Sequence, residues 1–203
     1  EILQEAQRLA PDYFEVARFM AYFYQKSGNY SDAREQYKLA IILSPATSQL
    51  HYWFGKFLLY SEESLDEAVE QFRLASKSDP DSVEVSLALA RGLLFQHDFD
   101  ETQKILDSIS EGINDAYSHL VKMYIDTEIQ VLYRRADDLS KAGNYKESLN
   151  FMEKMKEKFE KLNDSQKDKH LRQKLRKCTY TLNTIIKSGR QDSKSRALVV
   201  LDW

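Results

Sequence analysis

The three prolines of this chain recur at nearly constant intervals, and this spacing constrains the fold more than any other feature of the sequence. Pro11, Pro45 and Pro80 are separated by 34 and 35 residues. An alanine precedes each proline by five positions, and Leu, Tyr or Phe precedes it by eight. A period of this length indicates one supersecondary unit that is repeated along the chain.

A second short segment that recurs along the chain predicts how the unit is built. Gly28-Asn29-Tyr30 is matched by His97-Asp98-Phe99 and again by Gly143-Asn144-Tyr145. Glycine tolerates a positive φ, asparagine caps a helix, and the aromatic residue packs back on the turn. Proline disfavours a helix that continues through the residue before it, but it is accepted in the first turn of the following helix. The pattern therefore predicts pairs of helices that are joined by tight turns.

The composition excludes several other fold classes. Six glycines and three prolines among 203 residues are too few for the turns of an all-β sandwich or barrel. A single cysteine, Cys178, excludes an internal disulfide framework and the usual multi-cysteine zinc sites. An apolar share of 42% with 30% charged residues is sufficient for a continuous core with a soluble exterior.

Residues with catalytic or metal-binding potential do not form a recognisable motif. The glycines are isolated, so there is no phosphate-binding loop. The four histidines, His51, His97, His119 and His170, lack metal-ligand spacing. Cys178 lies on an apolar helical stripe, which is typical of a buried and inert thiol. We therefore expect no enzymatic activity, no metal and no cofactor.

The repeated residues resemble the tetratricopeptide repeat, a helix–turn–helix unit of about 34 residues. Residues 14–47 match it best, through Ala21, Tyr24, Gly28-Asn29-Tyr30, Ala33, Tyr37, Ala40 and Pro45. Further units are expected at 48–82, 83–112 and 129–162. The resemblance implies an all-α, right-handed α-solenoid of stacked helix pairs. The stretch from Asn114 to Ala142 contains no Gly or Pro and predicts a long helix, and a helical C-terminal cap is expected at the end of the chain.

Four parts follow from this assignment. Residues 1–10 are expected to be the second helix of a truncated preceding repeat, and 11–113 to hold three repeat units. Residues 114–162 are expected to hold a long helix and the fourth unit, and 163–203 a helical cap. Because the first repeat lacks its first helix, we expect the chain to be a piece of a longer protein. It loosely resembles the repeat regions that follow ATPase domains in large bacterial signalling and defence proteins.

The resemblance also implies a binding surface, because the first helix of each pair lines the inner face of such a stack. The expected peptide-binding groove consists of Arg18, Tyr22, Gln25, Tyr52, Lys56, Leu87 and Arg91. Arginine pairs with carboxylates and tyrosine packs against apolar side chains, so the expected partner is an acidic peptide or protein segment. Some family members clamp the C-terminal carboxylate of chaperones, but Tyr22 and Lys56 stand where that clamp has asparagine.

The charge distribution leaves three functions open. Residues 1–140 carry a net charge of −11 and residues 141–203 a net charge of +8. The favoured function is a non-catalytic protein–protein interaction module that acts as scaffold or sensor. The alternatives are self-association within a larger assembly and contact with nucleic acid through the basic C-terminal region. There is no apolar run of about 20 residues, so we expect no membrane partner and a cytoplasmic location.

Overall fold

The computed structural model describes residues 2–61, 64–113 and 118–160, together with Leu162, Gln173, Arg176 and Tyr180. Contacts divide the chain into two compact units, residues 1–113 and residues 114–203. Unit 1 contains α1 (Ile2–Leu9), α2 (Phe14–Lys26), α3 (Tyr30–Leu43), α4 (Ser48–Ser61), α5 (Leu65–Ser78), α6 (Val83–Phe95), α7 (Phe99–Ile109) and the 3-10 turn η1 (Ser110–Gly112). Unit 2 contains α8 (Ser118–Lys141) and α9 (Tyr145–Glu160).

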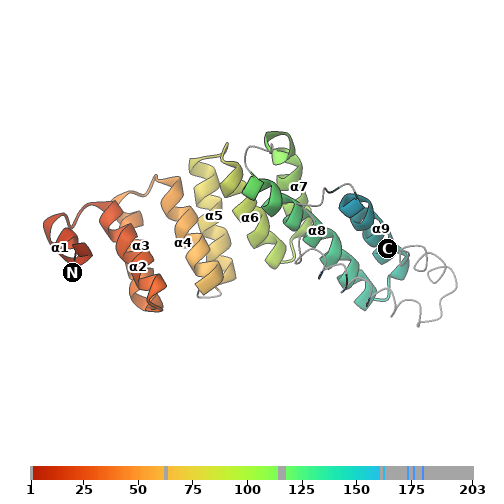
Figure 1. Cartoon of the computed structure of the whole chain (residues 1–203), viewed down its shortest axis with the longest axis horizontal. Helices are drawn as coiled ribbons and strands as arrows, with labels where there is room; N and C mark the ends of the chain where they lie inside the picture. Colours follow the sequence, from red (N-terminus) through yellow and green to blue (C-terminus); the bar gives the residue numbers. More distant parts are fainter. Residues whose placement is uncertain are drawn as a thin grey trace. The chain divides into compact units, whose positions relative to one another are not determined.

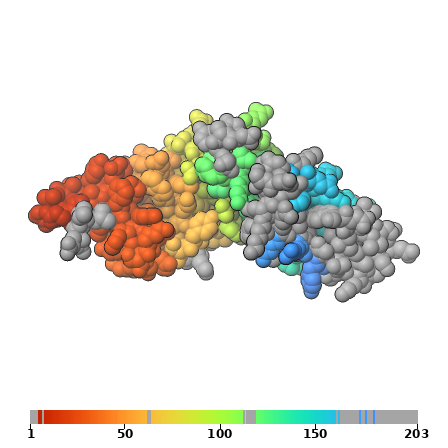
Figure 2. Space-filling model, viewed as in Figure 1, coloured from red at the N-terminus to blue at the C-terminus, as the bar shows by residue number. Residues whose placement is uncertain are grey.

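Unit 1 is a stack of helix pairs. The closest partners are α2 with α3, α4 with α5, and α6 with α7, and each pair packs on the next through α3 with α4 and α5 with α6. The first helices also contact one another, α2 with α4 and α4 with α6. The helices of this unit follow one another in sequence order from red to green (Figure 1), and their side chains fill the spaces between them (Figure 2). The predicted all-α solenoid is therefore confirmed.

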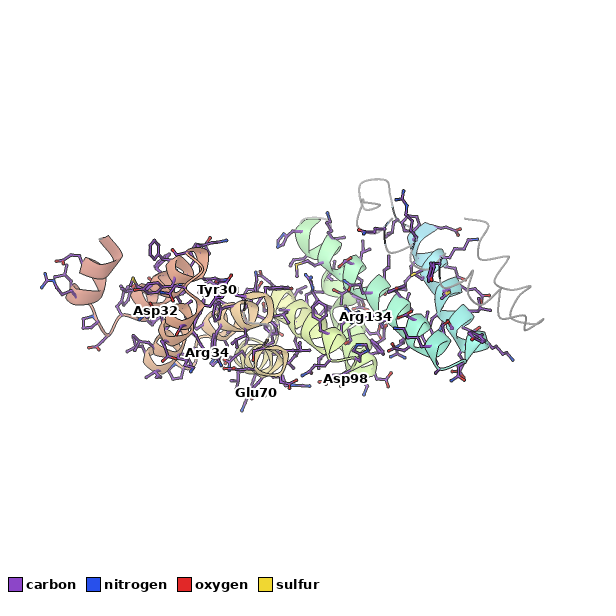
Figure 3. All side chains as sticks on the ribbon, turned by 90° about the horizontal axis from the view of Figure 1, so that it is seen from below. Tyr30, Asp32, Arg34, Glu70, Asp98 and Arg134 are labelled. Atoms are coloured by element: carbon purple, nitrogen blue, oxygen red, sulfur yellow. The ribbon has the colours of Figure 1, made fainter. Side chains whose placement is uncertain are left out.

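The recurring turn has one backbone geometry at its three positions. Gly28 and Gly143 have φ values of 77° and 78°, and His97 adopts the same left-handed conformation at 64°. The next amide then donates to the carbonyl five residues earlier, as Asn29 does to Tyr24 at 2.9 Å. This bond satisfies a carbonyl that the end of the helix leaves free. Tyr30 begins α3, and Asp98 lies just before α7 (Figure 3). The Asp98 carboxylate caps α7 by accepting a hydrogen bond from the amide of Glu101 at 3.1 Å.

Small residues allow the helices of unit 1 to approach closely around one aromatic ring. Phe72 of α5 is fully buried. A Cβ placed on Gly55 of α4 would lie 2.7 Å from Cε1 of Phe72 and 3.2 Å from the carbonyl oxygen of Ala68. A Cβ placed on Gly92 of α6 would lie 2.8 Å from Val69 and 3.5 Å from the Phe72 ring. The two glycines therefore make the space that the phenylalanine fills.

Polar contacts on the second helices connect neighbouring pairs. Arg34 of α3 forms an ion pair with Glu67 of α5. Arg73 of α5 donates two hydrogen bonds to Glu101 of α7, at 2.6 and 2.7 Å. The bidentate bond from Arg73 lowers the pKa of the Glu101 carboxyl and raises the pKa of the guanidinium. These contacts connect α3, α5 and α7 into one ladder, although partial exposure to solvent weakens each pair.

His51 has a structural role within the stack. Its imidazole is buried, with Nε2 3.0 Å from the Pro45 carbonyl oxygen and Nδ1 2.8 Å from Oε1 of Gln71. Both ring nitrogens are therefore within hydrogen-bond distance of a protein atom. The arrangement connects α4 to α5 and to the turn before α4.

Unit 2 contains a long helix and its partner. The 24 residues of α8 pack along α9, with Ile129, Leu132 and Met155 at the centre of the contact. Ser148 stands where the unit at 14–47 has Ala33, and its hydroxyl donates to the Ala136 carbonyl at 2.6 Å. The expected helical cap at 163–203, which contains His170 and Cys178, lies outside the described residues apart from three isolated positions. No helix of the described residues is long and apolar enough to cross a membrane.

Candidate functional site: a cationic and aromatic cavity between α2 and α4

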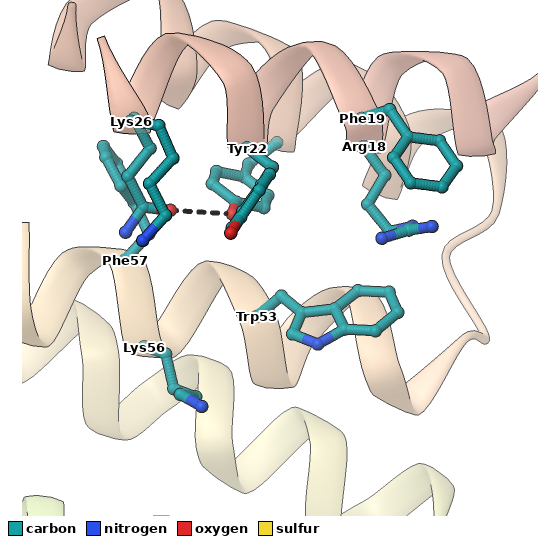
Figure 4. Close-up of a pocket in the computed structure, with 9 residues that line it drawn as sticks. Arg18, Phe19, Tyr22, Lys26, Trp53, Lys56 and Phe57 are labelled. Carbon is teal, nitrogen blue, oxygen red and sulfur yellow. Dashed lines mark hydrogen bonds between the residues drawn. The ribbon is translucent and has the colours of Figure 1, made fainter. Parts of the chain in front are cut away.

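A cavity of about 430 Å³ lies between the first helices of two successive pairs in unit 1. Its walls come mainly from α2 and α4, with one residue from α3. The lining residues are Arg18, Phe19, Tyr22, Gln25, Lys26, Tyr37, Trp53, Lys56 and Phe57. Figure 4 shows the side chains of Arg18, Tyr22 and Lys26 extending from α2 toward α4, which contributes Trp53 and Lys56.

Helical spacing explains why these side chains meet. Arg18, Tyr22 and Lys26 follow one another at intervals of four, so they lie on one face of α2. Trp53 and Lys56 are three residues apart on α4 and lie on one face of that helix. Because α2 and α4 are the first helices of adjacent pairs, the two faces border the same space.

Arg18 is held between two aromatic rings. The central carbon of its guanidinium lies 3.9 Å from the centre of the Phe19 ring and 4.4 Å from that of Trp53. A guanidinium over an aromatic face is attracted by the negative charge density of the ring. A stacked guanidinium still presents its N–H groups along its edge, in the geometry that suits a carboxylate. The two rings therefore position a cation and leave its donors available.

Two lysines add positive charge to the cavity. Nζ of Lys26 lies 5.3 Å from the centre of the Tyr22 ring. Nζ of Lys56 lies 5.0 Å from the centre of the Tyr52 ring and donates to the Tyr52 hydroxyl at 3.3 Å. Both lysines are exposed. Within the part of the chain that the structure describes, neither they nor Arg18 form an ion pair with a carboxylate.

A hydrogen-bonded chain stabilises one wall of the cavity. The hydroxyl of Tyr37 donates to Oε1 of Gln25 at 3.1 Å, and Nε2 of Gln25 donates to the hydroxyl of Ser61 at 3.1 Å. Burial raises the pKa of Tyr37 to about 12, so the hydroxyl keeps its proton even at alkaline pH, where an ordinary tyrosine ionises. Tyr37 thus remains a donor and fixes the orientation of the Gln25 amide.

The structure brings together four of the seven residues that the sequence singled out. Arg18, Tyr22, Gln25 and Lys56 line the cavity. The sequence interpretation missed five lining residues, namely Phe19, Lys26, Tyr37, Trp53 and Phe57. Lys26 follows Tyr22 by one turn of α2, and this spacing alone predicts that the two side chains lie on the same face of the helix.

The other three predicted residues lie elsewhere in unit 1. Tyr52 is 6% exposed and its hydroxyl donates to Glu84 at 2.6 Å, which connects α4 to α6. Burial, together with the Glu84 carboxylate, raises the pKa of Tyr52. The assignment of Leu87 to the groove surface needs correction, because its side chain is fully buried in an almost entirely apolar α6. Arg91 is partly buried, 6.0 Å from the centre of the Tyr60 ring, and its Nε is buried without an acceptor among the described residues.

Sequence comparisons give a limited picture. No protein-family model matches the chain. An uncharacterised protein of Haemophilus influenzae is 32% identical over 76 residues, which cover 37% of this chain. The match spans 42% of the length of that protein, less than half.

Solved structures decide the fold. The structure of YrrB, described as a TPR protein with an unusual peptide-binding site, is similar with a TM-score of 0.61 and 15% identity, covering 100% of this chain and 90% of YrrB. The chain therefore has the tetratricopeptide fold. PilW, a widely conserved type IV pilus biogenesis factor, gives a TM-score of 0.51 at 15% identity, covering 96% of this chain and 77% of PilW. MamA gives 0.51 at 17% identity, covering 78% of this chain and 85% of MamA.

Proposed function

We propose that unit 1 is a non-catalytic protein-binding module that captures a peptide or protein segment on the face shared by α2 and α4. The observation that carries this proposal is a cavity whose walls combine exposed aromatic side chains with cations that have no carboxylate partner in the described residues. Such groups are suited to holding a ligand because aromatic residues and arginine dominate the energetics of protein interfaces. The peptide-binding site of YrrB, a protein of the same fold, supports the same class of function.

The architecture favours capture by a preformed surface. The helices that form the cavity are fixed by packing on their partners, α2 on α3 and α4 on α5. Arg18 is stacked between two rings, and Gln25 is held by Tyr37 and Ser61. A site whose side chains are already positioned loses less conformational entropy on binding. The module would then act as a scaffold or a sensor in which binding itself is the function.

A displayed library of random peptides tests the proposal, because it samples many ligand chemistries at once. We expect the 203-residue chain to enrich a family of related peptides. A Phe19→Ala/Tyr22→Ala variant should lose this enrichment, because the two side chains are 46% and 53% exposed on the cavity face. Ile42→Ala is the matched control, since Ile42 is 74% exposed on α3 and does not line the cavity. A library from which the wild type enriches nothing, or from which both variants enrich the same peptides, would refute the proposal.

A further inference from the structure

The charge of the cavity is opposite to the charge of the unit that contains it. Residues 1–113 contain ten Lys and Arg against nineteen Asp and Glu, a net charge of −9. The nine residues that line the cavity include three cations, Arg18, Lys26 and Lys56, and no carboxylate. Nearly a third of the positive residues of an acidic unit therefore gather around one hollow. Segregated charge of this kind attracts ligands of the opposite sign and repels those of the same sign.

The positive groups surround apolar surface that a ligand can reach. Phe19 is 46% exposed and Tyr22 is 53% exposed. Trp53 is partly exposed and forms one of the two rings that enclose Arg18. An anion that pairs with Arg18 would therefore place its neighbouring groups against aromatic faces. A purely charged ligand would leave this surface in water, whereas a ligand with both characters would cover it.

We infer that the cavity between α2 and α4 binds a peptide segment in which side-chain carboxylates flank an aromatic or large apolar residue. This inference rests on the proposed function and specifies the chemical class of the partner. Arg18 pairs with one carboxylate through the free edge of its guanidinium, and Lys26 and Lys56 attract the others. The apolar side chain between the carboxylates packs against Phe19, Tyr22 and Trp53. Three cations can engage more than one anionic group, which favours Asp and Glu side chains over a single terminal carboxylate.

A nucleic acid strand also combines negative charge with groups that stack on aromatic rings. The acidic surroundings argue against it. A strand that reaches beyond a cavity of about 430 Å³ would bring its regularly spaced phosphates against a unit of net charge −9. A short peptide can confine its carboxylates to the positions of the three cations.

Fluorescence anisotropy with labelled peptides tests the inference on the whole chain. The first peptide, blocked at both ends, carries Glu and Asp around a central Tyr and Leu, and the second has Gln and Asn in place of the acids. We expect the acidic peptide to bind about tenfold tighter or more, and its advantage to shrink as salt rises. A third peptide with Ala in place of Tyr and Leu should bind more weakly than the first. A labelled single-stranded oligonucleotide that binds as tightly as the acidic peptide would overturn the inference.

Substitutions then assign the binding to the cavity. Arg18→Gln should reduce affinity for the acidic peptide about tenfold and leave the weak binding of the amide peptide unchanged. Lys38→Gln on α3 is the matched control, because Lys38 is exposed and does not line the cavity. Circular dichroism establishes that each variant is folded. Equal binding of the acidic and amide peptides, or equal losses in both variants, would overturn the inference.

The failure of this inference differs from the failure of the proposed function. If the displayed library enriches neutral or basic peptides whose binding requires Phe19 and Tyr22, the module function stands and the acidic specificity is wrong. If the library enriches nothing that depends on those two residues, the proposed function itself is wrong.

Discussion

Replacing Gly55 by alanine tests how the stack of unit 1 is packed, because two effects of similar size oppose each other at this position. Gly55 lies inside α4, where alanine is favoured over glycine by about 1 kcal/mol. If propensity alone mattered, Gly55→Ala would stabilise the protein by about this amount.

The surroundings of Gly55 reverse this expectation. The added Cβ would lie 2.7 and 2.8 Å from two carbons of the Phe72 ring and 3.2 Å from the Ala68 carbonyl oxygen. Phe72 is fully buried, with Gly92 of α6 close to its ring and Val69 three residues before it on α5. The buried ring therefore has to shift against packed neighbours, and overpacking of this kind costs about 1–3 kcal/mol. We expect a net destabilisation of about 1 kcal/mol after the helix-propensity gain is subtracted.

Urea unfolding followed by circular dichroism measures the difference. A second substitution identifies its cause, since Phe72→Leu removes part of the ring that the methyl group meets. We expect Gly55→Ala to be destabilising in the wild-type background and neutral or stabilising when Phe72 is leucine, with a coupling of about 1 kcal/mol between the two sites. An increase in stability from Gly55→Ala alone, or strict additivity of the two changes, would refute the packing argument.

Three further predictions concern individual groups. Burial raises the folded-state pKa of Tyr37 to about 12 from its ordinary value of 10, so its contribution to the free energy of unfolding is complete below pH 10 and is lost as the pH rises to 12. In alkaline denaturation, the loss of stability over this pH range should therefore be smaller in Tyr37→Phe than in the wild type. Ser148→Ala removes the bond to the Ala136 carbonyl and should destabilise the α8–α9 hairpin by about 1 kcal/mol, measured by hydrogen exchange in α9; unchanged exchange would contradict this. His97→Gly relieves a positive φ and should raise the melting temperature, with a gain of up to about 1 kcal/mol; a lower melting temperature would show that contacts of the imidazole outweigh the strain.

The repeated turn shows why much of the fold could be predicted from the sequence. Local chemistry decides the left-handed residue and the helix cap, so Gly28-Asn29 and Gly143-Asn144 could be recognised from residue types alone. His97 has the same backbone conformation although residues other than glycine are uncommon there, and the turn was indicated by the alignment of His97 with the two glycines.

The cavity shows where sequence interpretation fails. One residue along a helix corresponds to a rotation of about 100°, so Tyr52 and Trp53 point in quite different directions. The sequence assigned Tyr52 to the binding surface, but the packing of α4 between its neighbours buries it and places Trp53 at the cavity. The burial of Leu87 likewise depends on the packing of an α6 that is apolar on nearly every side. Tertiary contacts determine which side of each helix faces the cavity, and the spacing of residues in the sequence does not specify it.

The most direct test of the binding site is the indole N–H signal of Trp53 in a ¹H–¹⁵N NMR spectrum. Replacing Trp203 by phenylalanine leaves Trp53 as the single indole in the chain, because the sequence contains two tryptophans. Adding the acidic peptide should shift this signal progressively to saturation, and Arg18→Gln should reduce the shift at the same peptide concentration. An indole signal that stays in place while anisotropy shows the peptide to be bound would place the ligand elsewhere and contradict the assignment of the cavity.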